Sequence, residues 1–508
     1  MQLGIDFGTT RTVVACVDRG NYPIVDFVDN AGDSVGWIPS LAAARVTTGE
    51  LRFGFDAAAV ADDPAFLLLR SFKRLLSQPD AGPSQTVLAG AHELRVADLV
   101  HGFLSYVRRA LATASNVQRA VAKDDTLRVV VAVPANAHGA QRFVTLDAFR
   151  RAGFDVMAML NEPSAAGFEY THRHRNTLTS RRDSVVVYDL GGGTFDASLV
   201  RMVGAHHAVL GTAGIARLGG DDFDELLAKA ALDQVGLEMD ALSPQALLGL
   251  LTQCRDAKER LHPNSKKIAL DLESFGASAA VTVSVADFYD ACMPLVERTL
   301  DAMAPVLGPA SEEAAEIAGV YVVGGASELP IIARTLRERF GRRVHRSQYP
   351  SAAVAIGLAI AADESAGFAL ADRYSRTFGV FREGAGGQEI VYDPIFAPGT
   401  ELPVHTKDPL TCTRMYRAAH NVGHFRFFEC NAVDGGRPRG DMALFGDVYF
   451  PFDAGLTEAK DLARVAVQRT DANGPRICER YSLDENGIVD VLIRNVDSGY
   501  ERAFRLGG

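Results

Sequence analysis

The stretch YDLGGGTFD at residues 188–196 decides the fold of this chain, because a shorter version, IDFGTT, occurs at residues 5–10. Each copy is a run of strand-forming residues that ends in aspartate and is followed by a glycine turn and a threonine. A pattern that returns once at this distance indicates a duplicated domain rather than a series of short repeats. Two such halves facing each other predict a two-lobed molecule with a cleft between the lobes.

The sequence around both copies alternates short apolar strand patterns with helical patterns. This alternation predicts an α/β architecture in which helices cover the sheets. The predicted strands are Leu3–Phe7, Val13–Val17, Leu127–Val133, Ser184–Tyr188, Ala197–Val200 and Gly319–Val323. The predicted helices are Ala97–Ala114, Gln141–Ala152, Asp221–Val235 and Pro244–Leu261.

The pattern changes after about Ala362 and becomes a series of short extended runs broken by Gly, Pro, Asn and Asp. This change predicts an antiparallel β domain. Its predicted strands include Thr377–Phe381, Phe425–Cys430, Val465–Arg469 and the pair Ile477–Leu483 and Ile488–Arg494, with a turn at Asp484–Gly487 between the last two. The chain is therefore divided into an α/β domain at 1–362, a linker at 363–376 and a β domain at 377–508.

Composition limits the class of protein. The chain has 508 residues, 47% hydrophobic and 23% charged, which is ordinary globular usage with room for two or three domains. Its formal net charge of −11 argues against a surface built mainly for nucleic acid. Its six cysteines contain no C-x-x-C pair, which argues against a zinc knuckle or a disulfide framework. No secretion signal and no membrane-spanning run is recognised, so we expect a cytoplasmic protein without a membrane partner.

The two glycine turns suit phosphate binding. There is no G-x-x-x-x-G-K-[ST] motif, so a P-loop enzyme is not supported. Instead, small residues at a hairpin tip let backbone N–H groups approach phosphate oxygens, at Gly8, Thr9 and Thr10 in one turn and at Gly191, Gly192, Gly193 and Thr194 in the other. Asp6 and Asp189 could hold a hydrated Mg²⁺ between them. Either turn alone could be no more than a tight hairpin, but the ordered pair is far more specific.

A series of motifs resembles that of the heat shock protein 70 (Hsp70) chaperone family, within the actin, hexokinase and heat-shock ATPase superfamily. The motifs occur in family order at Gly4–Thr10, Val131–Pro134, Asn161–Ala166, Asp189–Asp196, Leu218–Asp224 and Val323–Gly325. The resemblance covers about 1–362 strongly and 378–506 more weakly. It implies a duplicated actin-like (ribonuclease H-like) ATPase domain followed by an antiparallel β-sandwich that binds peptides.

The resemblance also implies roles for particular residues. Lys73 matches the family's catalytic lysine, Glu162 orders the attacking water, and Thr194 and Asp196 approach the γ-phosphate. Without the resemblance, a lysine in such a segment is more often simply solvated. Phosphoryl transfer needs mainly positioning and charge neutralisation, which these groups provide. Further contacts to ATP or ADP are implied for Gly220, Asp222, Lys258, Gly324 and Gly325.

The partners implied by the resemblance are extended hydrophobic polypeptide segments, a J-domain protein and a nucleotide-exchange factor. Pro134 and Arg142 match the family's proline switch and its arginine partner, which carry the nucleotide state to the second domain. Several departures weaken these expectations: Asn136, His138 and Ala158 replace family residues concerned with coupling or with J-domain contact. The chain also ends without the helical lid pattern of the family, for which we expect rapid peptide exchange.

Departures in the adenine pocket predict altered nucleotide binding. Glu328 stands where the family has a stacking arginine, and Ala326, Arg255 and His262 replace a serine, a glutamate and a serine. Losing the stacked arginine removes about 0.5–2 kcal/mol. We expect weaker or less adenine-selective binding.

Three functions remain open from the sequence. The first is an ATP-driven chaperone-like protein that binds extended segments in its β domain. The second is a nucleotide-sensing switch or scaffold that binds one dedicated partner with little ATP turnover. The third, an actin-like polymer or a sugar kinase, explains the two turns but not the β domain.

Overall fold

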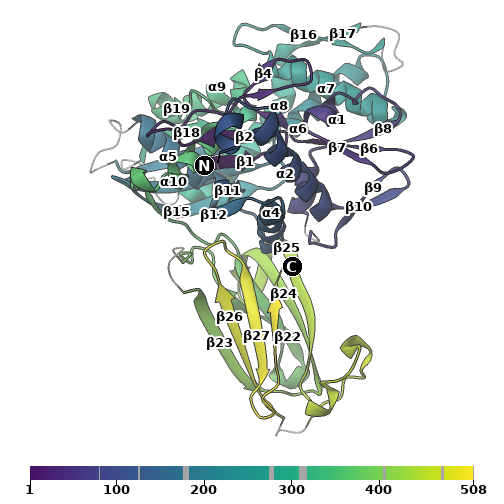
Figure 1. Cartoon of the computed structure of the whole chain (residues 1–508), viewed down its shortest axis with the longest axis vertical. Coiled ribbons are helices and arrows are strands. Elements are labelled where there is room, and N and C mark those ends of the chain that lie inside the picture. Colours follow the sequence, from purple (N-terminus) through teal and green to yellow (C-terminus); the bar gives the residue numbers. More distant parts are fainter. Residues whose placement is uncertain are drawn as a thin grey trace. The chain divides into compact units, whose positions relative to one another are not determined.

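The computed structural model describes residues 1–78, 81–123, 126–174, 182–273, 280–307, 317–403, 408–470 and 474–506 (Figure 1). The chain forms two compact units. The first contains residues 1–75, 86–136 and 148–370, and the second contains residues 76–85, 137–147 and 371–508. Helix α4 (Gly139–Arg151) has residues in both. Among the described helices, none is both long and apolar enough to cross a membrane.

The first unit is built around two mixed sheets. Each sheet contains one copy of the repeated sequence in which a strand ends in aspartate and is followed by a glycine turn, called the acid–glycine pattern below. In the five-stranded sheet the order is β12 (Asp155–Asn161), β11 (Arg128–Val133), β1 (Gln2–Phe7), β2 (Arg11–Cys16) and β5 (Ile38–Pro39). Strand β1 pairs antiparallel with β2 and parallel with β11. The predicted strands in this part of the chain are confirmed.

The six-stranded sheet repeats this pairing. Its order is β19 (Val344–Arg346), β18 (Ile317–Val323), β13 (Ser184–Leu190), β14 (Phe195–Val203), β15 (His206–Ile215) and β20 (Ala369–Ala371). Strand β13 pairs antiparallel with β14 and parallel with β18. Each copy of the pattern is therefore the turn of a hairpin whose first strand also has a parallel neighbour. Strand β20 lies within the segment predicted as a linker, where it adds to the edge of the sheet.

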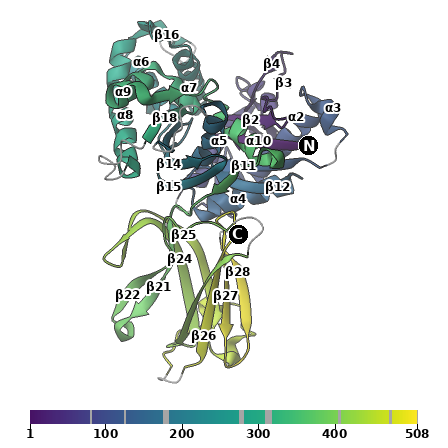
Figure 2. The same ribbon diagram turned by 90° about the vertical axis from the view of Figure 1, so that its left-hand side faces the viewer.

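Helices α5 (Glu162–His174) and α10 (Ala353–Ala362) pack against each other (Figure 2). Helix α10 also packs on β1. Two glycines allow this close approach. A Cβ added to Gly4 would lie 2.2 Å from the backbone nitrogen of Ala359, and one added to Gly357 would lie 1.8 Å from the carbonyl oxygen of Ala165. Side chains at these positions would push α10 away from both neighbours.

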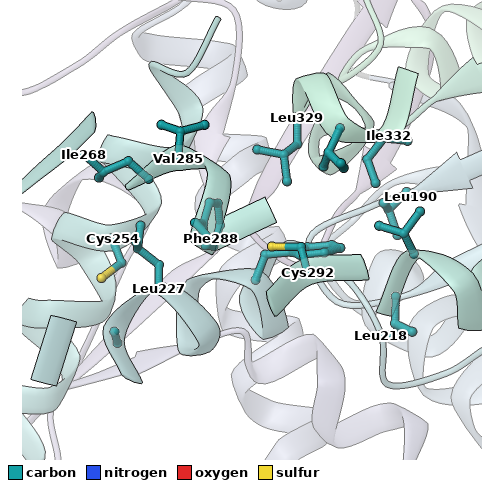
Figure 3. Close-up of a cluster of buried hydrophobic side chains, with 14 of the residues drawn as sticks. Leu190, Leu218, Leu227, Cys254, Ile268, Val285, Phe288, Cys292, Leu329 and Ile332 are labelled. Atoms are coloured by element: carbon teal, nitrogen blue, oxygen red, sulfur yellow. The ribbon is translucent and has the colours of Figure 1, made fainter. Parts of the chain in front are cut away.

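An apolar core lies beside the six-stranded sheet and includes residues from α6 (Gly220–Asp233), α7 (Pro244–Glu259), α8 (Val285–Leu307) and α9 (Pro330–Phe340). Figure 3 shows part of this core, in which Leu227, Phe288 and Ile332 are fully buried. Each such side chain contributes about 1.5–3 kcal/mol by leaving water. Helix α7 begins at Pro244, where the hydroxyl of Ser243 accepts a 3.2 Å hydrogen bond from the N–H of Ala246. The core thus fixes α6 and α7, whose ends reach the candidate site.

Smaller elements complete the first unit. The sheets are β7 (Leu51–Phe53), β6 (Leu41–Arg45) and β8 (Phe66–Arg70); β9 (Thr86–Ala89) with β10 (His92–Arg95); β16 (Lys267–Asp271) with β17 (Ala280–Ser284); and β3 (Phe27–Val28) with β4 (Ser34–Val35). The helices are α1 (Phe55–Ala58), α2 (Val96–Thr113) and α3 (Gln118–Val121). The four predicted helices all occur.

The second unit contains two four-stranded antiparallel sheets that share one apolar core. One sheet has the order β22 (Glu389–Phe396), β21 (Thr377–Gly384), β24 (Val422–Asp434) and β25 (Arg437–Pro451). The other has the order β23 (Leu410–Arg417), β26 (Arg476–Leu483), β27 (Val489–Asn495) and β28 (Glu501–Arg505). The predicted antiparallel β pattern is confirmed.

Two local predictions in this unit had different outcomes. The turn at Asp484–Gly487 is present, and a carboxylate oxygen of Asp484 accepts the N–H groups of Asn486 and Ile488 at 2.9 and 2.8 Å. The predicted strand Val465–Arg469 is wrong, because only Arg469 forms an isolated bridge. The side chain of Asn421 bonds the N–H of Gln468 and the carbonyl of Ala466, so these backbone groups are satisfied without a ladder.

Candidate functional site

The two glycine turns of the first unit lie directly against each other. A Cβ added to Gly192 would lie 2.5 Å from Cγ2 of Thr10, and one added to Gly193 would lie 2.8 Å from Cγ2 of Thr9. No side chain fits at such distances, so the contact between the β1–β2 turn and the β13–β14 turn requires glycine. The contact brings Asp6 and Asp189, which lie 183 residues apart in the sequence, to one cavity.

This cavity of about 90 Å³ collects buried charges around Lys73. Lys73 lies in the 3₁₀ helix Phe72–Ser77, is 4% exposed, and donates a 2.9 Å hydrogen bond to Glu162 at the start of α5. Asp189 and Asp196 are also buried. One lysine thus faces the carboxylates of Asp6, Glu162, Asp189 and Asp196, so the group carries excess negative charge when all four are ionised.

The crowding of carboxylates shifts their pKa values. Burial, with Glu162 nearby, raises the pKa of Asp6 to about 7, although Lys73 opposes the shift. Burial and Glu162 likewise raise the pKa of Asp196 to about 7. Burial followed by Glu162 also raises the pKa of Asp189. Burial alone would lower the pKa of Lys73, but Glu162 and Asp6 outweigh it and raise that pKa. The arrangement favours binding of a cation near the aspartates.

The excess negative charge at the cavity is of the kind that a bound Mg²⁺ would compensate. Within the described residues, no three histidine, cysteine or acidic side chains converge closely enough to hold a metal by themselves. Two carboxylates on one cavity wall still fit Mg²⁺, because this ion keeps several waters and takes further ligands from phosphates. Asp6 and Asp189 are the residues that would hold it.

Part of the cavity wall comes from α6 and α7. The ammonium of Lys258 donates to the carbonyl of Gly220 at 2.5 Å and lies 2.6 Å from Asp224. Arg255 pairs with Asp221 at 2.8 Å and with Asp224 at 3.5 Å. Lys258 and Arg255 are therefore already paired with acidic residues of α6.

Most of the residues singled out by the sequence line this one cavity: Asp6, Gly8, Thr9, Thr10, Lys73, Glu162, Asp189, Gly191, Gly192, Thr194, Gly220, Lys258, Gly324 and Gly325. Three do not. Asp196 accepts the N–H of Asn136 at 3.4 Å, and Gly193 lies against Thr9. Asp222 pairs with Arg74 at 3.3 Å and accepts the N–H of Gly219 at 2.8 Å, while its neighbour Asp221 lines the cavity.

Sequence reasoning missed several lining residues: Arg11, Asp221, Glu259, Pro350, Ser351 and Val354. Arg11 and Asp221 directly follow predicted motif residues, so their position next to a turn was an available signal. Glu259 directly follows Lys258 and had a comparable signal. Pro350, Ser351 and Val354 had none, because they reach the cavity only through the packing of α10 and of the segment before it.

A second cavity of 860 Å³ adjoins the first and shares Arg11, Lys258, Glu259, Gly325 and Ala326 with it. Three of the four departures in the predicted adenine pocket line this cavity: Glu328, His262 and Ala326. Glu328 forms a 2.9 Å ion pair with Arg346. The cavity therefore presents a carboxylate at the position where the resemblance led us to look for a stacking arginine.

Arg142, the residue that matches the arginine partner of the proline switch, is buried within the second unit. Its guanidinium donates to the carbonyl oxygens of Asn486 at 3.2 Å and Ala137 at 3.4 Å. Arg142 is therefore not a solvated charge on a helix surface.

The chain matches the family model described as Hsp70 protein over residues 109–384, which is more than half of its length. With the paired turns, the buried lysine and the surrounding acids, this match places the chain in a known class of proteins. The chain belongs to the Hsp70 family.

Its similarity to individual proteins extends over almost the whole chain. Proteins named chaperone protein HscA homolog from Burkholderia multivorans (strain ATCC 17616 / 249), Burkholderia mallei (strain SAVP1) and Burkholderia pseudomallei (strain 668) are each 32% identical to it over 521 aligned positions. The alignments cover 99% of this chain and 77% of each relative. The resemblance found from the motifs is thus confirmed.

Proposed function

We propose that this Hsp70-family protein is an ATP-hydrolysing chaperone that couples its nucleotide state to the binding of extended hydrophobic polypeptide segments. Membership in the family supports chaperone-type ATPase chemistry in general. The observation that carries the proposal is the convergence of Asp6, Asp189, Lys73 and Glu162 on one cavity between two glycine turns. In this proposal residues 1–362 form a two-lobed actin-like ATPase domain, 363–376 a linker, and 377–508 a β-sandwich.

The proposed chemistry depends on positioning. The backbone of Gly8–Thr10 and Gly191–Thr194 would cradle the phosphates, and Gly220, Lys258, Gly324 and Gly325 would contact the rest of ATP or ADP. Lys73, already held by Glu162, would orient the attacking water, while Thr194 and Asp196 would act beside the γ-phosphate. Mg²⁺, when bound to Asp6 and Asp189, would neutralise charge that develops on the phosphates. Asp222 would act indirectly, through its contact with Arg74.

The second unit supports the proposed binding of extended segments. Strands β22 and β23 are each at the edge of a sheet, and Ile390 and Met415 on them are 68% and 64% exposed. An edge strand with exposed apolar side chains can pair with an extended segment through main-chain hydrogen bonds. J-domain proteins and nucleotide-exchange factors remain candidate partners, and the cytoplasm is the proposed compartment.

The test is ATP turnover by the full chain with magnesium, in the presence and absence of model hydrophobic peptides. We expect measurable basal turnover that peptides stimulate, and a loss of at least about 100-fold in Lys73→Ala and Asp189→Asn, because each removes a positioned charge from the cavity. Binding of ATP without any turnover, together with copurification of one protein, would replace this proposal with the second candidate below.

The second candidate is a nucleotide-sensing switch that binds one dedicated partner. The ion pair between Glu328 and Arg346 favours it, because the cavity that would take the base has a carboxylate where the resemblance implies a stacking arginine. We expect ATP binding that is weaker than is usual in the family and less selective over GTP. Calorimetric titration with ATP and GTP tests this, and strong preference for tightly bound ATP would contradict it. ATP-dependent light scattering would instead indicate a filament.

A further inference from the structure

Arg11 occupies the junction between the two adjoining cavities and lines both. It is the first residue of β2 and directly follows the Gly8–Thr10 turn. Its guanidinium lies 4.6 Å from the ring centroid of Trp37 and forms an ion pair with Glu259, the last residue of α7. Arg11 is thus a fixed, planar cation beside the loop proposed to hold phosphates.

The other cations of the smaller cavity form ion pairs with buried acids. Lys73 is buried with Glu162, and Lys258 is buried with Asp224 and the carbonyl of Gly220. Arg255, whose side chain is 17% exposed, is shared between Asp221 and Asp224. Withdrawing Lys73 would leave the buried carboxylate of Glu162 without its cation, which is strongly unfavourable. Lys258 and Arg255 are both held by the buried acid Asp224.

The pair formed by Arg11 differs because its acid is accessible to water. The side chain of Glu259 is 40% exposed and that of Arg11 is 28% exposed. Exposed ion pairs are worth little, since water replaces the lost partner at small cost. Phosphate, by contrast, accepts two parallel hydrogen bonds from a guanidinium, and such bonds are among the strongest in proteins. An exchange of Glu259 for a phosphate group is therefore favourable.

We propose that Arg11 is a nucleotide-binding residue that exchanges Glu259 for the phosphates of a nucleoside di- or triphosphate. The inference rests on the proposed function and adds a residue to it. Glu259 competes with the nucleotide for Arg11, so the two members of one ion pair have opposite effects on affinity. Trp37, the single tryptophan of the chain, stacks on Arg11 and reports the exchange.

The experiment is calorimetric titration of the full chain with ADP, ATP and adenosine, in the presence of magnesium. Arg11→Gln is expected to weaken ADP and ATP binding about 10- to 100-fold. Adenosine binding should stay unchanged, because Arg11 contacts only the phosphates in this proposal. Glu259→Gln is expected to strengthen ADP and ATP binding about three- to tenfold, since the competing carboxylate is gone. Arg11→Lys should recover part of the affinity.

Trp37 fluorescence provides a second readout. ADP should change it in the wild type and in Glu259→Gln, but not in Arg11→Gln. The matched control is Arg128→Gln, which removes the arginine of a 2.9 Å ion pair with Glu364 that belongs to neither cavity. This control should bind nucleotide like the wild type.

The outcomes separate the inference from the function on which it rests. If Arg11→Gln and Glu259→Gln both weaken binding, the pair is a structural clamp and the inference is wrong. If Arg11→Gln binds ADP like the wild type, the inference is also wrong, while the proposed function stands. If the wild type binds neither ATP nor ADP, both are overturned. Circular dichroism of each variant shows whether a change in affinity comes from misfolding.

Discussion

Buried carboxylates occur in both units, but their surroundings differ. In the first unit four acids lie around a single lysine, and burial and mutual repulsion raise the pKa of Asp6, Asp189 and Asp196. In the second unit Glu479 is completely buried, yet it accepts hydrogen bonds from Arg382 at 2.7 and 3.0 Å and from the hydroxyl groups of Tyr416 and Tyr481. Arg382 lies on β21 and Glu479 on β26, so the network links the two sheets, and Arg382 also pairs with Asp393 on β22.

The difference distinguishes a binding site from a structural ion pair. Carboxylates that the protein leaves undercompensated lower its stability and favour the arrival of a cation. A carboxylate whose lone pairs are satisfied by arginine and tyrosine has nothing to gain from a ligand. We therefore expect substitutions of buried acids to have opposite effects on the stability of the two units.

The largest expected effect is in the second unit. Glu479→Ala should lower the free energy of unfolding by about 3–5 kcal/mol, because it leaves Arg382 without its main partner inside the core. Chemical denaturation monitored by circular dichroism measures the change. A loss below about 1 kcal/mol would show that the network is not structural and would remove the contrast between the units.

The second-largest expected effect on the free energy of unfolding comes from Glu169, a buried acid outside the cavity. Burial raises the pKa of Glu169 to about 7 from an ordinary value of 4.5, despite the opposing effect of Arg173, and the hydroxyl of Tyr321 donates to its carboxylate. Since the folded-state pKa is raised, its contribution to stability is fully present below about pH 4.5 and is lost as the pH rises through 7. We expect this loss to amount to about 3 kcal/mol.

Glu169→Gln should abolish that part of the pH dependence. Denaturation of wild type and variant at pH 5 and pH 8 gives the comparison, and the difference between the two proteins cancels the other acids that titrate in this window. Equal losses of stability in both proteins between the two pH values would contradict the raised pKa of Glu169.

A smaller effect of opposite sign is expected in the cavity. Asp189→Asn should stabilise the nucleotide-free protein by about 0.5–2 kcal/mol at pH 8, because it removes one of the crowded negative charges while keeping the shape of the side chain. Thermal unfolding without magnesium or nucleotide measures this change. The matched control is Glu479→Gln in the second unit, which should destabilise. A less stable Asp189→Asn would mean that this carboxylate is already compensated.

The smallest effect belongs to the surface of the second unit. Arg494 and Glu501 face each other on β27 and β28, with 3.9 Å between their charged groups and half-exposed side chains. Glu501→Gln should change the free energy of unfolding by less than about 0.5 kcal/mol, since water screens the pair. A loss near that of Glu479→Ala would show that burial does not decide the outcome.

The sequence by itself determined the local features of this protein. Hydrophobic periodicity and turn residues act over a few positions, so the strands before Gly8 and Gly191, the helices α2, α4, α6 and α7 and the turn at Asp484–Gly487 could be predicted. The two acid–glycine turns also indicated a shared site, because their similarity implied equivalent positions in two halves. The prediction of a strand at Val465–Arg469 was wrong, because the distant side chain of Asn421 satisfies backbone groups that a strand would use.

Only the tertiary structure decided which charges meet and which are buried. Lys73 lies 89 positions from Glu162 in the sequence, and Arg11 lies 248 positions from Glu259. Neither pairing follows from local patterns, because α5 and α7 are placed by apolar packing that involves the whole first unit. The choice of Asp221 over Asp222 for the cavity wall arises in the same way, from the direction in which the first turn of α6 presents each side chain. Burial and electrostatic environment depend on residues distant in sequence, and the chemistry of the site depends on both.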